Sequence, residues 1–222
     1  FPTRRSSDLA APLVPLRLFK SAQRTGANLA RALFVGSMAA FWFFVSQFLQ
    51  VAKHMNPLET GLAFLPMTLA SFAIAFFVPR LSRKFGDAPF LAGGLATVAI
   101  GTLWLSRFTP DGSYFFEVAL PMLLVGLGQG ASTIRLTSAG IAGVSPEDAG
   151  AASGIVSTHV QLGSALGLSV LISLSANAGK GISNAGEAIA HQASLAVFGG
   201  GVLCTIALAV VLIWVLPKRH QH

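Results

Sequence analysis

The chain has 222 residues, of which 53% are hydrophobic and only 10% are charged, and its mean hydropathy is +0.68. A soluble domain carries roughly 25% charged residues, so this composition excludes an ordinary water-soluble globule and predicts an integral membrane protein. We attribute the net charge of +7 to Lys and Arg in cytoplasmic loops, and we expect the lipid bilayer, not nucleic acid, as a partner.

Six long apolar segments follow one another along the chain. A membrane-spanning helix needs about 20 apolar residues. Barrel strands are shorter and alternate in polarity, whereas these segments are apolar on all sides, so we predict an all-α integral membrane bundle. The spans are expected at about 28–51, 58–78, 89–105, 114–143, 148–176 and 191–216, with a cytoplasmic segment at 10–27 and a cytoplasmic tail at 217–222.

The distribution of Lys and Arg predicts the orientation. If the first span begins in the cytoplasm, ten basic residues lie inside and three outside, setting aside residues 1–9. Cytoplasmic loops collect Lys and Arg, so both ends of the six-span region are expected in the cytoplasm, in a plasma (inner) membrane. The inside set is Arg17, Lys20, Arg24, Arg31, Arg80, Arg83, Lys84, Arg135, Lys218 and Arg219, and the outside set is Lys53, Arg107 and Lys180.

Glycines recur at four-residue spacing in the fourth and fifth spans. This spacing places two glycines on one helix face, where a neighbouring backbone can approach closely. Tight packing is the favoured interpretation, and a sliding interface is the alternative. Pro66 and Pro121 lie inside the second and fourth spans, where proline permits a kink. The glycine pairs are Gly126 with Gly130, Gly150 with Gly154, and Gly163 with Gly167.

The sequence shows no catalytic or metal-ligand spacing, so we expect neither an enzyme nor a cofactor or metal site. Polar residues inside the spans are functional candidates, because burial in hydrocarbon is costly. His159 either packs through hydrogen bonds, the favoured interpretation, or titrates near neutral pH. Arg31 and Arg135 are expected to extend to headgroups at the inner face. The other candidates are Gln47, Gln50, Gln129 and Gln161.

The first span is rich in aromatic residues. Phe41, Phe44 and Phe48 follow helical spacing on one face. Lipid contact or bundle core is the simpler interpretation. The functional alternative is an aromatic wall for a lipophilic or cationic ligand, because ring faces attract positive charge.

Four stretches resemble one transporter family. They are PLVPLRLFKSAQRTGANLARALF from Pro12, FFVSQFLQ from Phe43, NPLETGLAFLPMTLA from Asn56 and SPEDAGAASGIVSTHVQLGSALGLSV from Ser145. Together they resemble the C-terminal half of a major facilitator superfamily transporter, within its fourteen-helix drug:proton antiporter branch. The resemblance covers about residues 11–216.

The family also has an inner-loop signature, and PRLSRKFGDAPFL from Pro79 resembles its degenerate C-terminal copy. Leu81, Lys84 and Gly86 keep the residue type of the motif. Arg83 replaces an acid and Asp87 replaces a basic residue, so the gating salt bridge of the full motif is not carried over.

The resemblance implies a six-helix half built from two inverted three-helix repeats. The first helix of each repeat lines the substrate cavity in this family. The implied cavity residues are therefore Phe41, Phe44, Gln47, Phe48 and Gln129. The second and fifth spans would face the other half, and the third and sixth would face lipid.

The leading hypothesis is thus a fragment of a proton-coupled multidrug efflux permease. Its partners would be a small lipophilic substrate and the missing N-terminal half, and a proton gradient would be the energy source. A membrane structural or assembly subunit that transports nothing is the alternative. The opening FPTRRSSDL back-translates to a string resembling a short-read sequencing adapter, so residues 1–9 are expected to be an adapter artefact fused to a truncated reading frame.

Overall fold

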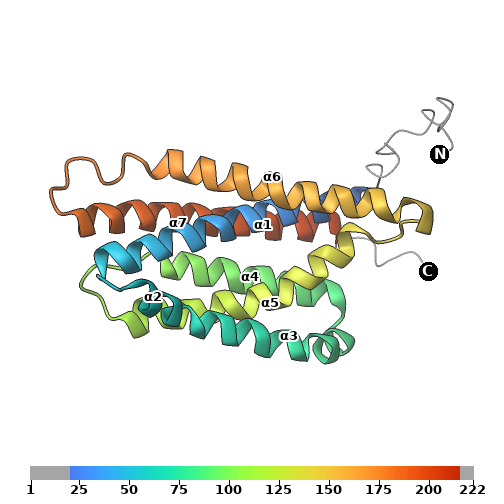
Figure 1. The fold of residues 1–222 in the computed structure, drawn as a ribbon. Coiled ribbons are helices and arrows are strands. Elements are labelled where there is room, and N and C mark those ends of the chain that lie inside the picture. Colours follow the sequence, from blue (N-terminus) through green and yellow to red (C-terminus); the bar gives the residue numbers. More distant parts are fainter. Residues whose placement is uncertain (1–20, 216–222) are drawn as a thin grey trace, which may run out of the picture.

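The computed structural model describes residues 21–215, and this part of the chain is helical without strands (Figure 1). The all-helical prediction is confirmed. Short π-helical segments lie at Phe48–Ala52, Phe115–Ala119 and Val211–Val215, and a 3-10 turn lies at Pro146–Asp148. The α-helices are α1 (Ala22–Gln47), α2 (Pro57–Ala63), α3 (Leu65–Phe85), α4 (Asp87–Leu105), α5 (Leu120–Gly140), α6 (Ala149–Ser175) and α7 (Ala185–Val210).

Each of the six predicted spans corresponds to a helical segment. Five segments are long and apolar enough to cross a membrane, and the third span is the shorter apolar stretch Pro89–Leu105 within α4. The five are Ala22–Ala52, Pro57–Lys84, Phe115–Gly140, Pro146–Ser175 and Ala185–Val215.

Capping residues move two helix starts away from the predicted span limits. Ser21 caps α1 by accepting from Arg24 N at 3.4 Å, so residues 22–27 of the expected cytoplasmic segment are helical. Asn184 caps α7 by accepting from Gly186 N at 2.8 Å, so α7 begins at Ala185, six residues before the predicted start of the span at 191. Hydropathy marks where a helix becomes apolar, whereas the cap marks where it begins. The predictions for residues 1–20 and 217–222 lie outside the described residues.

The second span is interrupted where proline predicts it. Asn56 and Glu59 form a capping box at the start of α2, with Pro57 in its first turn. The helix ends at Ala63, and α3 begins at Leu65, directly before Pro66. Proline lacks an N–H and disfavours a helical residue before it, so the chain bends here and continues as α3.

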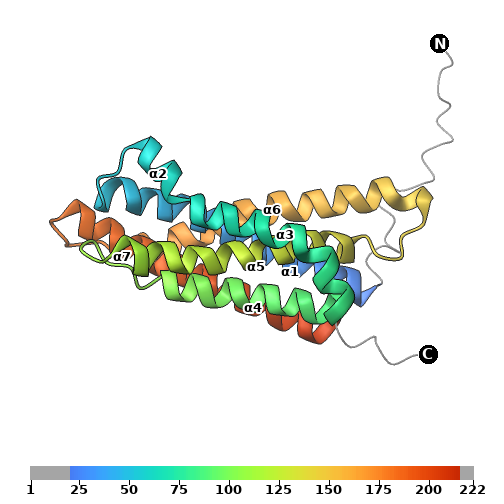
Figure 2. The same ribbon diagram turned by 90° about the horizontal axis from the view of Figure 1, so that it is seen from below.

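The two three-helix groups interlock. The first three spans are α1, α3 and α4, and the last three are α5, α6 and α7. Helix α1 packs mainly on α6 and α7, whereas α5 packs mainly on α3 and α4, and α4 and α7 also meet. Figure 1 shows these two layers, α6, α1 and α7 above and α4, α5 and α3 below. In Figure 2, α3 and α6 lie along one side of the bundle, and α4 and α7 along the opposite side.

One end of the bundle carries most of the basic residues that the structure describes. It is formed by the start of α1, the α3–α4 turn, the α5–α6 connection and the end of the last helix (Figure 1). We call it the basic end. Lys53, Arg107 and Lys180 belong to the opposite end. The basic residues at the basic end are Arg24, Arg31, Arg80, Arg83, Lys84 and Arg135.

Glycines allow close helix packing at two crossings. Gly126 and Gly130 of α5 lie against the α3 backbone at Met67 and Ser71. Gly163 and Gly167 of α6 lie against Ala32 and Gly36 of α1, and Ser71 Oγ donates to Gly126 O at 2.9 Å. In contrast, a Cβ added at Gly150 or Gly154 would meet no atom within 4 Å. Four of the six predicted packing glycines therefore pack within the described bundle.

We predict opposite effects for two alanine substitutions in α6. In Gly163→Ala, the new Cβ would lie 2.5 Å from Ala32 O, so α1 and α6 must separate and stability falls by about 1–3 kcal/mol. Gly154→Ala meets open space and gains helix propensity, so stability is unchanged or rises by about 0.5–1 kcal/mol. Unfolding in detergent measures both. Equal destabilisation by the two variants would contradict the packing assigned to Gly163.

Candidate functional site

A cavity of about 330 Å³ opens between α1, α3 and α5. We call it the α3–α5 pocket. Trp42 of α1 and Phe72 of α3 supply aromatic surface, and their exposed fractions are 41% and 73%. The Trp42 ring also lies against the Phe64 ring, with centroids 4.6 Å apart. The other lining residues are Met67, Thr68, Ser71, Ala75, Gln129, Gly130, Thr133 and Ile134.

Gln129 gives this pocket a polar group. Its Oε1 atom is buried and accepts no hydrogen bond from the described residues. A buried acceptor without a donor costs free energy, and a ligand with a hydrogen-bond donor relieves that cost. Beside it, Gly130 lacks a side chain, and a Cβ there would lie 2.5 Å from Ser71 O. The pocket is therefore a largely apolar, partly aromatic surface, and one of its lining residues, Gln129, carries an unpaired Oε1.

The predicted aromatic face of the first span lies in the bundle core instead of on this pocket. Phe41, Phe44 and Phe48 are buried, and Phe48 stacks on Phe108 with ring centroids 4.0 Å apart. Of the five predicted cavity residues, only Gln129 lines the pocket, and Gln47 is half-buried outside it. Phe41 lies near Phe64, with ring centroids 6.2 Å apart, so the ring neighbours of this face come from the α2–α3 junction and from the segment after α4.

Sequence reasoning missed Trp42. It follows Phe41 directly, so it projects about 100° away from the buried aromatic face. One signal was available in the sequence. A tryptophan in the middle of a span does not suit an aromatic belt at the membrane surface, which favours a role inside the protein.

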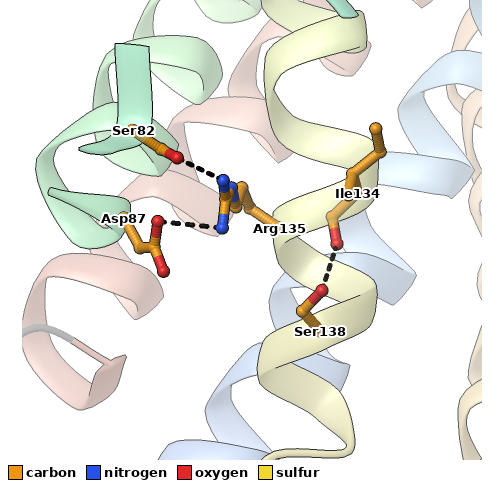
Figure 3. A network of polar contacts seen from close by, with 5 residues as sticks. All are labelled: Ser82, Asp87, Ile134, Arg135 and Ser138. Atoms are coloured by element: carbon orange, nitrogen blue, oxygen red, sulfur yellow. Dashed lines mark hydrogen bonds and ion pairs between the residues drawn. The ribbon is translucent and has the colours of Figure 1, made fainter. Parts of the chain in front are cut away.

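Two arginines at the basic end turn into the protein. Arg135 of α5 forms an ion pair with Asp87, its Nη1 lying 2.8 Å from Oδ1, and donates from Nη2 to Ser82 Oγ (Figure 3). Arg31 of α1 donates to Thr133 O at 3.1 Å and to Thr137 Oγ1. The expectation that both side chains extend to lipid headgroups is therefore corrected. Carbonyl, hydroxyl and carboxylate acceptors on neighbouring helices lie within reach of both side chains.

The inner-loop motif supplies the partner of Arg135. Gly86 ends α3 with a positive φ of 86°, a conformation that favours glycine, and α4 starts at Asp87. Arg83 and Lys84 are exposed, and Leu81 is half-buried. An ion pair thus exists in this loop after all. It uses Asp87, one of the two positions where the charge differs from the family motif.

The polar candidates of α6 lie apart from the α3–α5 pocket. Gln161 is exposed, and His159 is half-buried with Nδ1 2.8 Å from Ile155 O. The acids nearest the spans have partners of their own. Glu117 accepts from Thr109 N at 2.7 Å, and Glu59 accepts from Asn56 N at 2.8 Å. Among residues 21–215, no three His, Cys, Asp or Glu side chains gather into a metal site.

Comparison with known proteins places this arrangement in a family. Residues 27–222 match the family model described as Major Facilitator Superfamily. This chain belongs to the Major Facilitator Superfamily. The match covers most of the chain, and it confirms the predicted family and the predicted integral membrane class.

Several curated proteins of this superfamily resemble the chain. It is 34% identical to the cephamycin export protein CmcT of Amycolatopsis lactamdurans, over 91% of this chain and 41% of that protein. It is 30% identical to the puromycin resistance protein pur8 of Streptomyces alboniger, over 92% of this chain and 42% of that protein. It is 30% identical to the multidrug efflux pump LfrA of Mycolicibacterium smegmatis, over 76% of this chain and 33% of that protein. The chain therefore spans less than half the length of each of these relatives.

Charge reversal tests the ion pair of this superfamily member. Asp87→Lys places a cation beside the Arg135 guanidinium, which is only 20% exposed, so stability should fall by roughly 1 kcal/mol. Combining it with Arg135→Glu restores an opposite pair and should recover most of the loss. Arg83→Glu in the same loop is the control and should show no coupling to Arg135→Glu. Unfolding in detergent measures the free energy of unfolding of each variant. If the change in the double variant equals the sum of the changes in Asp87→Lys and Arg135→Glu, the result would argue against the ion pair.

Proposed function

We propose that this chain forms one half of a proton-coupled exporter of lipophilic or cationic compounds. The α3–α5 pocket carries the proposal, because it combines aromatic surface, apolar surface and the unpaired Gln129 Oε1. The names of two relatives, which describe cephamycin export and multidrug efflux, support the same class of activity.

The lining of the pocket suits such substrates. Trp42 and Phe72 offer ring faces, which attract a ligand cation as well as apolar groups. Gln129 accepts from an N–H or O–H of the bound compound. With one polar anchor and a largely apolar wall, the pocket favours lipophilic molecules of varied shape, because little of its surface demands a specific hydrogen-bond pattern.

The second half of the cavity comes, in this proposal, from a further part of the same protein. Helices α3 and α6 lie on one side of the bundle and expose many large apolar side chains, including Leu69, Phe76, Leu162 and Leu166 (Figure 2). The relatives are more than twice as long as the region they share with this chain. We propose that the missing half packs on this side and that substrate passes between the halves as they rock, with the basic end in the cytoplasm.

Export by the full-length protein should depend on the pocket. We expect Trp42→Leu and Gln129→Leu each to lower the rate of dye efflux from vesicles about tenfold, since each removes about 1.4 kcal/mol of ligand contact. Phe43→Leu is the matched control, because Phe43 is exposed beside Trp42 but outside the pocket. Equal loss in Phe43→Leu and Trp42→Leu would remove the pocket from the transport route.

The chain alone should not transport. The proposed cavity needs a second half that residues 21–215 do not supply, and Glu59 and Glu117, near the span ends, already accept hydrogen bonds from Asn56 N and Thr109 N. Reconstituted vesicles containing only this chain are therefore expected to show neither dye counterflow nor proton movement. Robust counterflow would overturn the proposal that a second half is required.

A further inference from the structure

A second, much smaller cavity lies near the basic end, where α1, α5 and α6 meet. Its volume is about 20 Å³, measured as the space open to the centre of a water molecule. Arg24 and Asn28 of α1, Gly140 of α5 and His159 of α6 line it. It shares no residue with the α3–α5 pocket, and the proposed transport function does not use it.

Asn28 presents an unsatisfied acceptor to this cavity. The residue is 5% exposed, and its buried Oδ1 receives no hydrogen bond from the described part of the chain. Gly140 is needed beside it, because a Cβ there would lie 2.7 Å from Oδ1. A buried carbonyl oxygen is costly without a donor, so this side of the cavity demands one.

His159 presents a second acceptor. Its Nδ1 lies 2.8 Å from Ile155 O, and a carbonyl oxygen can only accept, so Nδ1 carries the hydrogen. In the neutral ring, Nε2 then keeps its lone pair and accepts. The contact with Ile155 occupies Nδ1, so Nε2 is the acceptor that this cavity-lining ring still offers.

The charges select the ligand. A cation is disfavoured because the positively charged Arg24 is one of the lining residues, and Arg24 also donates to Gly143 O at 3.4 Å. An anion is disfavoured because it would meet the two acceptors, Asn28 Oδ1 and His159 Nε2. A small neutral molecule with two donors satisfies both acceptors. Water is that molecule, and a cavity with about 10–15 Å³ of such space holds one.

We propose that one water molecule occupies this cavity and donates to Asn28 Oδ1 and to His159 Nε2. The water joins α1 to α6 close to the glycine crossing of these helices. His159 acts here as a positioning residue that holds the water. Its role is separate from substrate binding and does not depend on transport.

Nitrogen-15 NMR of the histidine rings, with the chain in lipid bilayers, tests the hydrogen-bond pattern directly. A difference spectrum against His159→Phe isolates the His159 signals from those of the other histidines. At pH 8 we expect hydrogen on Nδ1, a bare Nε2, and magnetisation transfer from water to Nε2. Hydrogen on Nε2, or no transfer from water, would overturn the proposal.

The sign of a stability change provides a second test. If water is bound, Asn28→Leu should lower the folding equilibrium constant about tenfold, because a satisfied hydrogen bond is lost. If the cavity is empty, the same change removes a costly orphan oxygen and should raise that constant. An increase would overturn the proposal.

A double-variant cycle separates the bridge from simple steric effects. Asn28→Leu and His159→Phe remove the same water, so the combined variant should lose about as much as either change alone. Asn28→Leu with Gln161→Leu is the control and should be additive, because Gln161 does not line the cavity. Additive effects in both cycles would contradict the bridge. If a variant does not fold, the NMR pattern of the unmodified chain decides.

Discussion

The structure depends on the close approach of helix backbones. In a bilayer the lipid is as apolar as the side chains, so helices associate through van der Waals contact and hydrogen bonds, not through exclusion of water. Glycine permits that contact at Gly163 and Gly167 against α1, and at Gly126 and Gly130 against α3. These two crossings tie the first helix of each three-helix group to the second helix of the other group. The interlocked bundle, and with it the position of the α3–α5 pocket, follows from them.

Polar side chains complete this packing near the basic end. Arg31 links α1 to α5 through Thr133 O, and Arg135 links α5 to the α3–α4 turn through Asp87 and Ser82. Thr133 also lines the α3–α5 pocket, one turn after Gln129. The arginine links and the pocket therefore share one stretch of α5. A movement of α5 that reshapes the pocket must also strain these links, so the shape of the pocket is physically connected to the basic end.

The two sides of the bundle differ in what remains uncovered. Helices α4 and α7 pack on each other and on the central helices, although α7 still exposes Phe198 and Ile206. The segments that contain α3 and α6, on the other side, bury a smaller share of their residues than the segment that contains α7 (Figure 2). Gly150 and Gly154 lie in α6 without neighbours, although their spacing matches that of the packed pair Gly163 and Gly167. Because Gly150 and Gly154 contact no other helix within this half, they are available for close contact with a second half, as the proposed function requires.

The all-helical membrane class and the family could be read from the sequence, and Pro66 marked a position where a kink is permitted. These features follow from composition, segment length and local backbone chemistry, which act over short stretches of chain. Only the tertiary structure decided that Phe41 and Phe48 are core while Trp42 lines the pocket, and that Asp87 meets Arg135. Neighbouring positions on one apolar helix are equivalent until another helix covers one of them. The partners of a long polar side chain likewise depend on which helices lie within its reach.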